Sequence, residues 1–186
     1  MRRFFRWNLT QAGWFVAAVC LFASAVYTLV LGPSALLEAT FPIGLSMLLS
    51  GFINVWIYHI NRHKLHGSHW LFADGMSTAL LSIFLLFNHT VSAPVIPFFL
   101  GVWELFSGVL KIMDGTFMRE DHIHGRITFT IAGFLELICG VAALLKPIAD
   151  NHHMHITVAI VLFIQCAGLI SKICLYPQLR IADDCT

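Results

Sequence analysis

The sequence predicts an all-α membrane protein, a six-helix transmembrane bundle built from three repeated helical hairpins. Hydrophobic residues make up 58% of the 186 residues and charged residues only 11%, whereas a soluble domain carries about 25% charge. Six apolar stretches are long enough to cross a bilayer, and small residues recur along them at a constant period. Since the net charge is only +1, no field favours nucleic acid, and the expected partner is the lipid bilayer.

The apolar stretches are each about 20 residues long, the length at which a helix spans about 30 Å of hydrocarbon. We expect them to be helical, because backbone N–H and C=O groups in lipid find partners only within their own helix. Almost nothing remains for a soluble domain, so residues 1–186 are interpreted as one membrane domain. The predicted spans are about residues 12–32, 41–60, 69–88, 95–117, 127–146 and 154–176.

The spans form three consecutive pairs with a period near 57 residues. The dipeptide Ser50-Gly51 returns 57 residues later as Ser107-Gly108, and Gly75 is followed 58 residues later by Gly133. Within a span the small residues lie seven positions apart, nearly two turns, and therefore share one face. Small faces let helices pack closely in a membrane, within one chain or between copies in a homo-oligomer. The residues predicted to pack in this way are Ala18, Ala25, Gly44, Gly51, Gly75, Ser82, Gly101, Gly108, Gly133, Gly140 and Gly168.

Basic residues distinguish the two sides of the predicted bundle. Ten of the eleven lysines and arginines fall in the N-terminus, in the second and fourth loops with their flanks, or near the C-terminal end. Lys111 and Lys172 are counted among these ten, and Lys146 is the one basic residue on the other side. The positive-inside rule then predicts that both termini lie in the cytoplasm.

Two stretches of the chain share motifs with a known family. One runs from His69 through Asp74-Gly75 to Asn88, and the other contains Trp103 and Ser107-Gly108. Both resemble the HdeD family of acid-resistance membrane proteins. The resemblance covers about residues 12–176. It implies six helices, the inner membrane of a bacterium, and a role in tolerance of acid or another stress. It supplies no catalytic residue and no cofactor.

Two acidic residues are expected near the middle of the membrane. Glu104 and Glu136 each lie about ten residues into a predicted span, on helices joined by one loop. A charge at the bilayer centre costs about 2.5–3.5 kcal/mol on insertion scales, so such a residue marks a candidate functional site. The pair is interpreted either as a proton-accepting site or as neutral carboxyl groups with hydrogen-bonded neighbours. Asp74, near the start of its span where negative charge suits the helix dipole, is a third candidate.

A histidine cluster is expected on the opposite side of the membrane from the termini. His152, His153 and His155 surround Met154, and His89 lies on the preceding loop of that side. Histidine changes charge between about pH 5 and 8, which suits a pH sensor, and histidine with methionine also suits copper. The third interpretation is a set of polar loop residues at the lipid headgroups, so no metal is assigned.

The sequence contains no nucleotide-binding loop, nucleophile elbow or zinc-protease histidine pair. The leading hypothesis is therefore a non-enzymatic membrane protein of stress or acid tolerance that needs no cofactor. The alternative is a small transporter or channel, coupled to protons through Glu104 and Glu136. The arrangement of these two carboxyl groups inside the bundle is the observation that bears most directly on both hypotheses.

Overall fold

Six helices make up the part of the chain that the computed structural model describes, namely residues 9–32, 36–61, 68–87, 95–120, 126–149 and 154–183. Each helix contains an apolar stretch of 19 to 25 residues that is long enough to cross a membrane. The protein is therefore a multi-pass membrane protein, and the predicted fold class is confirmed. The helices are α1 (Leu9–Leu31), α2 (Leu36–Asn61), α3 (Ser68–Phe87), α4 (Val95–Glu120), α5 (Arg126–Ala149) and α6 (Met154–Asp183).

Most helix ends lie within three residues of the predicted ones, and α2 and α6 are the exceptions. α2 begins at Leu36 instead of residue 41, which brings Glu38 into its first turn. An acidic side chain is favourable there, because the N-terminal end of a helix carries partial positive charge. α6 continues past residue 176 to Asp183. α1 is followed by Gly32 at a φ of 72°, a left-handed conformation that glycine adopts readily after a helix.

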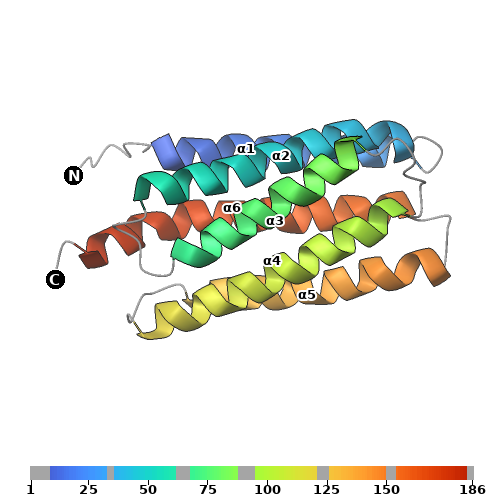
Figure 1. Ribbon diagram of the computed structural model, residues 1–186. Coiled ribbons are helices and arrows are strands. Elements are labelled where there is room, and N and C mark those ends of the chain that lie inside the picture. The colour runs from blue at the N-terminus through green and yellow to red at the C-terminus, as the bar shows by residue number, and fades with distance from the viewer. Residues whose placement is uncertain are drawn as a thin grey trace.

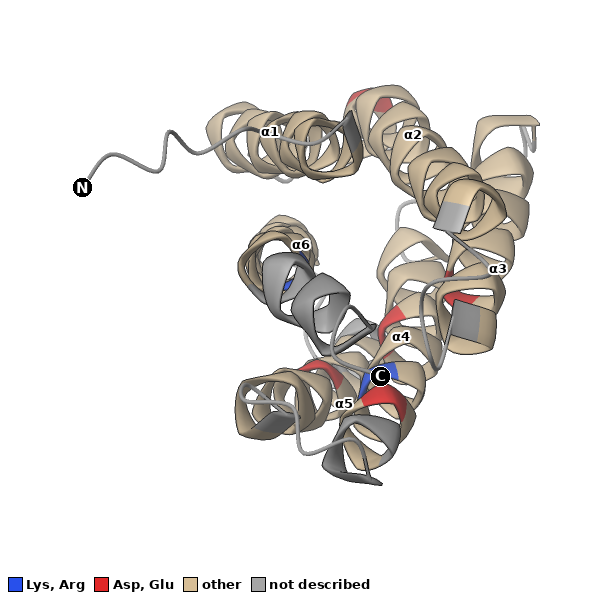
Figure 2. Cartoon of the chain, turned by 90° about the vertical axis from the view of Figure 1, so that its left-hand side faces the viewer, with Lys and Arg blue, Asp and Glu red and all other residues tan. Residues whose placement is uncertain are grey.

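The closest helix contacts join neighbouring repeats, not the two helices of one repeat. α2 packs most closely on α3, α4 packs on α5, and α6 returns to pack on α1. Along the bundle axis, α1 to α5 follow one another in an arc, and α6 lies between α1 and α5 (Figure 2). The first helix begins and the last helix ends at the same end of the bundle (Figure 1). The three hairpins thus close into a ring.

Glycines at equivalent positions of two repeats bring helix backbones into contact. A Cβ atom added to Gly51 of α2 would stand 2.8 Å from the carbonyl oxygen of Gly75 in α3. Fifty-seven residues further on, a Cβ atom on Gly108 of α4 would stand 2.7 Å from the carbonyl oxygen of Gly133 in α5. Neither position has room for a larger residue. The repeat unit of the sequence therefore uses its small faces to contact the next repeat.

A second layer of the same two interfaces follows one heptad away. Gly101 lies against the backbone of Gly140, with 3.0 Å between a Cβ atom built on Gly101 and the Gly140 carbonyl oxygen. Gly44, 57 residues before Gly101, faces the side chain of Leu86 instead. Ser82, which occupies the place of Gly140 in the preceding repeat, is fully buried. The small residues of the predicted set thus extend along both interfaces.

The third interface, between α6 and α1, is built from different residues. Ala18 and Ala25 of α1 are buried, and the thiol of Cys166 donates a hydrogen bond to the carbonyl oxygen of Ala18 at 3.3 Å. Cys166 lies 58 residues after Gly108, so it occupies the equivalent position of the third repeat. Gly168, 60 residues after Gly108 and also in the predicted packing set, faces the ammonium group of Lys111 instead.

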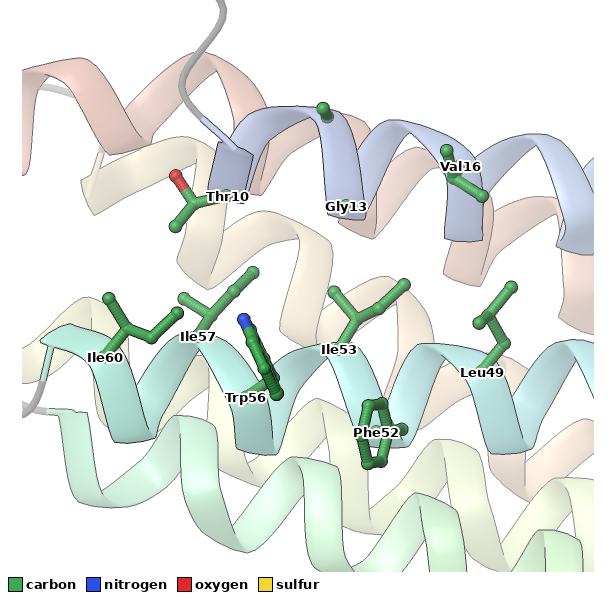
Figure 3. A pocket seen from close by; sticks show the side chains of 10 residues that line it. Thr10, Gly13, Val16, Leu49, Phe52, Ile53, Trp56, Ile57 and Ile60 are labelled. Atoms are coloured by element: carbon green, nitrogen blue, oxygen red, sulfur yellow. The ribbon is translucent and has the colours of Figure 1, made fainter.

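α1 and α2 leave an apolar groove between them near the start of α1. The groove has a volume of about 490 Å³. Ile53, Trp56 and Ile57 of α2 line it opposite Gly13 and Val16 of α1 (Figure 3). The lining is almost entirely hydrocarbon, so the groove offers no chemistry for a polar substrate. The chemically distinctive residues lie elsewhere, between α3, α4, α5 and α6.

Candidate functional site

Among the described residues, five acidic or basic side chains are buried in the interior of the bundle. Asp74 of α3, Glu104 and Lys111 of α4, Glu136 of α5 and Lys172 of α6 are each between 0 and 7% exposed. Acidic and basic residues gather where these helices meet (Figure 2). Charged groups within a membrane face the protein interior and need partners there. The arrangement of the partners therefore defines what the site can do.

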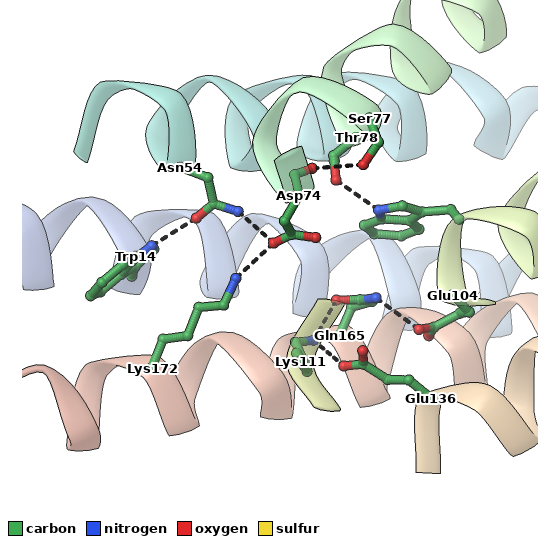
Figure 4. A network of polar contacts seen from close by, with 11 residues as sticks. Trp14, Asn54, Asp74, Ser77, Thr78, Glu104, Lys111, Glu136, Gln165 and Lys172 are labelled. Atoms are coloured by element: carbon green, nitrogen blue, oxygen red, sulfur yellow. Dashed lines mark hydrogen bonds and ion pairs between the residues drawn. The ribbon is translucent and has the colours of Figure 1, made fainter. Parts of the chain in front are cut away.

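One half of the site joins the two acids that the sequence singled out. The ammonium group of Lys111 forms an ion pair with Oε1 of Glu136 and also donates to Oε1 of Gln165 at 3.3 Å. The amide nitrogen of Gln165 donates to Oε2 of Glu104 at 2.7 Å. Glu104 and Glu136 thus point into the same interior space and are linked through one lysine and one glutamine (Figure 4).

The other half of the site surrounds Asp74 and joins four helices. Lys172 of α6 donates to Oδ2 of Asp74 at 2.7 Å. Asn54 of α2 donates to the same oxygen at 3.0 Å, and its own carbonyl oxygen accepts the indole N–H of Trp14 of α1 at 2.9 Å. Asp74 lies beyond the first turn of α3, where the helix dipole is weak, and a buried lysine pairs with its carboxylate directly.

Two carboxylate oxygens of the site have no hydrogen-bond partner. Oε1 of Glu104 and Oε2 of Glu136 are both buried, and no donor in the described part of the chain reaches them. A buried polar atom without a partner carries a desolvation cost. A proton on one of these carboxyl groups would lower that cost by removing the charge. The arrangement is therefore suited to proton binding.

The interpretation of Lys111 and Lys172 as cytoplasmic flanking charges is wrong. Both side chains are buried, at 3% and 6% exposure, and both form ion pairs inside the bundle. The sequence contains a signal for this placement. Glu104 and Lys111 are seven residues apart, as are Gln165 and Lys172, so each pair lies on one face of its helix.

The internal repeat also relates the two halves of the site. Asn54 and Lys111 are 57 residues apart, and each donates to a carboxylate on the helix that follows its own, Asp74 and Glu136 respectively. The same position of the hairpin thus carries an amide in the first repeat and an ammonium group in the second. Divergence of one position accounts for the change from a polar contact to an ion pair.

The predicted histidine cluster lies mostly outside the described residues, which include neither His89 nor His152 nor His153. His155 is half-buried in the first turn of α6, and its Nδ1 atom has no hydrogen-bond partner among the described residues. Within the ranges that the structure describes, no group of three His, Cys, Asp or Glu side chains could hold a metal ion. The pH-sensing and metal interpretations of the cluster therefore stay predictions.

A membrane-embedded bundle of repeated helical hairpins, with ion pairs in its interior, is the class of protein that the fold and the site define. A family described as a short repeat of unknown function (DUF308) matches the chain twice, over residues 16–87 and 73–145. The two matches begin 57 residues apart, which is the period of the glycines, and the chain belongs to this family. Comparisons with curated proteins and with solved structures found no match.

Proposed function

We propose that this protein is a non-enzymatic membrane protein of the HdeD type, which supports tolerance of acid or a related stress by responding to protons within its bundle. Membership of the short-repeat family supports the comparison, because HdeD proteins belong to that family. Family membership alone does not name an activity. The observation that carries the proposal is the balance of charge in the bundle interior.

Among the described side chains that are buried, three carry carboxyl groups and two carry ammonium groups, while Asp114 of α4 is half-buried. Lys111 pairs with Glu136, and Lys172 pairs with Asp74. Glu104 forms no ion pair with any described residue and accepts one hydrogen bond from an amide. An uncompensated buried charge is expensive, so the interior is most stable with one bound proton. Gain or loss of that proton changes the net charge of the interior and gives the bundle a response to pH.

Replacement of Glu104 by glutamine is expected to abolish acid survival without unfolding the protein. The amide keeps an oxygen that can accept the hydrogen bond from Gln165, but it cannot exchange a proton. In a deletion strain that carries E104Q, survival after an acid challenge should be no better than in the deletion strain itself. The matched control is E38Q, which removes an exposed carboxylate from the first turn of α2 and should survive like wild type. Wild-type survival of E104Q, at equal protein levels in the membrane, would contradict the proposal.

The second candidate function is a small transporter or channel coupled to protons. The unpartnered oxygens of Glu104 and Glu136 favour it, because a conducted proton needs free acceptor atoms along its path. If this function holds, the protein in liposomes should dissipate a pH gradient, and E104Q should not. Gradient decay at the rate of protein-free liposomes would eliminate this candidate and leave the first one intact.

We also propose that the protein resides in the bacterial inner membrane with both termini in the cytoplasm. The shared end of the bundle at which α1 begins and α6 ends supports a common side for the termini (Figure 1). When the buried Lys111 and Lys172 are removed from the ten basic residues counted on that side, eight remain. Lys146 still stands alone on the other side, so the positive-inside rule gives the same orientation.

A further inference from the structure

We propose that the buried acidic and basic side chains form a proton site with access from one side only. This charge cluster consists of Asp74, Glu104, Lys111, Glu136 and Lys172. Protons reach Glu104 from the end of the bundle at which α1 begins and α6 ends, and the opposite half of the bundle is closed to them. This inference rests on the proposed proton-responsive function and adds a direction to it. It distinguishes a site that reports the pH of one compartment from a conducting pore.

Polar side chains continue from Glu104 toward the end of the bundle at which α1 begins and α6 ends. On α4, Lys111 and the half-buried Asp114 follow Glu104 by seven and ten residues, or about 10 and 15 Å at 1.5 Å per residue. α6 runs parallel to α4 (Figure 1), and its Gln165 bonds Glu104 while Lys172 lies seven residues further along. The two helices therefore carry polar groups from the middle of the membrane toward the same end.

Polar groups of α1, α2 and α3 lie on that side of Glu104 as well. The contacts of Asp74 with Asn54, and of Asn54 with Trp14, extend away from Glu104 toward the start of α1 (Figure 4). The charged and titratable groups of the described residues that interact with Glu104 are Lys111 on its own helix, Asp74 on α3, and Glu136 and Cys139 on α5. Asp114 and Lys172 lie further along and interact with Asp74. A proton that leaves Glu104 in this direction meets further polar groups.

In the opposite direction, the helices that carry Glu104, Glu136 and Gln165 present hydrocarbon to the interior. Ile96 and Leu100 precede Glu104 on α4, Val158 and Leu162 precede Gln165 on α6, and Ala143 follows Glu136 on α5. All five of these apolar side chains are 0% exposed. Close-packed apolar side chains leave no space for the water that would carry a proton. This apolar plug (Ile96, Leu100, Ala143, Val158 and Leu162) separates Glu104 from the far end.

Polar residues beyond the plug do not bridge it. His155 lies in the first turn of α6, three residues before Val158 and therefore on the far side of the plug. The hydroxyl of Ser82 on α3 donates to the carbonyl oxygen of Ala79 in its own helix at 2.7 Å. The buried hydroxyls of Ser24 and Thr28 lie in the second half of α1 and donate to Ser46 and to the carbonyl oxygen of Ser24, respectively. Among the described residues, none of these groups bonds a member of the charge cluster, so protons on the two sides of the plug exchange with different compartments.

The test is infrared spectroscopy of the full-length protein in liposomes that are sorted by capture of a C-terminal tag, so that all molecules face the same way. A protonated carboxylic acid has a C=O stretch that a carboxylate lacks. In wild type, a band of this kind should respond to a pH step on the side of the chain ends and not to the same step on the other side. The band should be absent in E104Q and present in E38Q.

A band that responds to the far side, or equally to both sides, would overturn the inference, and so would its persistence in E104Q. L162N places an amide in the apolar plug and should make the band respond to both sides, but the wild-type comparison decides the matter even if L162N does not fold. The outcome is separable from that of the survival assay. If the band responds to both sides and E104Q loses acid survival, only the one-sided access is contradicted. If the band responds to one side and E104Q survives like wild type, only the proposed function is contradicted.

Discussion

Replacement of Lys111 by methionine is expected to destabilise the bundle by about 3–5 kcal/mol, the usual cost of removing one partner from a buried ion pair. Lys111 pairs with Glu136 and also donates to Gln165. In K111M, the Glu136 carboxylate would stay buried with no cation beside it, and Gln165 would lose its donor. We expect a large fall in the midpoint of thermal unfolding in detergent and poor recovery from membranes.

A double variant distinguishes the lost pairing from the lost packing of the lysine chain. K111M/E136M removes both charges, and apolar replacements of a buried ion pair are often neutral or stabilising. It should therefore recover most of the stability that K111M loses. The interpretation fails if K111M unfolds at the wild-type temperature, or if the double variant is as unstable as the sum of the two single variants.

Replacement of Gly108 by alanine is expected to separate α4 from α5. The added Cβ atom would stand 2.7 Å from the carbonyl oxygen of Gly133, and this backbone atom cannot rotate out of the way. Overpacking of a close contact costs about 1–3 kcal/mol, and G108L should cost more than G108A because its side chain is longer. The measurement is again unfolding in detergent, with membrane expression as a second readout.

Gly13 is the matched control for this prediction. A Cβ atom on Gly13 would lie 3.2 Å from Cγ2 of Ile53, a side-chain methyl group that can shift more easily than a backbone atom. Alanine also has a higher helix propensity than glycine, by about 1 kcal/mol, so G13A should be close to neutral or stabilising. If G108A and G13A have the same stability, the backbones of α4 and α5 do not touch in the way described.

The six spans and the repeat could be predicted from the sequence because both depend on single helices. Hydrophobic length fixes a span, and the seven-residue spacing of Gly101 and Gly108 fixes the face that carries small residues. Neither property says which helix that face meets. The structure directs the face of α4 to Gly133 and Gly140 of the next repeat, a choice that depends on how three hairpins close around one another.

The site could be predicted only in part, for a related reason. Glu104 and Glu136 stood out because acids in the middle of apolar spans are costly. Lys111 and Lys172 did not, because a lysine in the last third of a span is also typical of a headgroup anchor. Their partners are Glu136 and Asp74, 25 and 98 residues away in sequence. Only the three-dimensional packing of α3, α5 and α6 brings those groups together.

The closure of α6 on α1 means that every hairpin obtains its closest partner from a neighbour and not from itself. The covalent order of the helices is then largely independent of the contacts that stabilise them, so cyclic permutation of the gene would preserve every interface. One hairpin alone would expose both of its helix-packing surfaces to lipid, and it could bury them only by assembling with other copies. The tertiary contacts of this chain therefore correspond to the contacts that three separate hairpins would make in an oligomer.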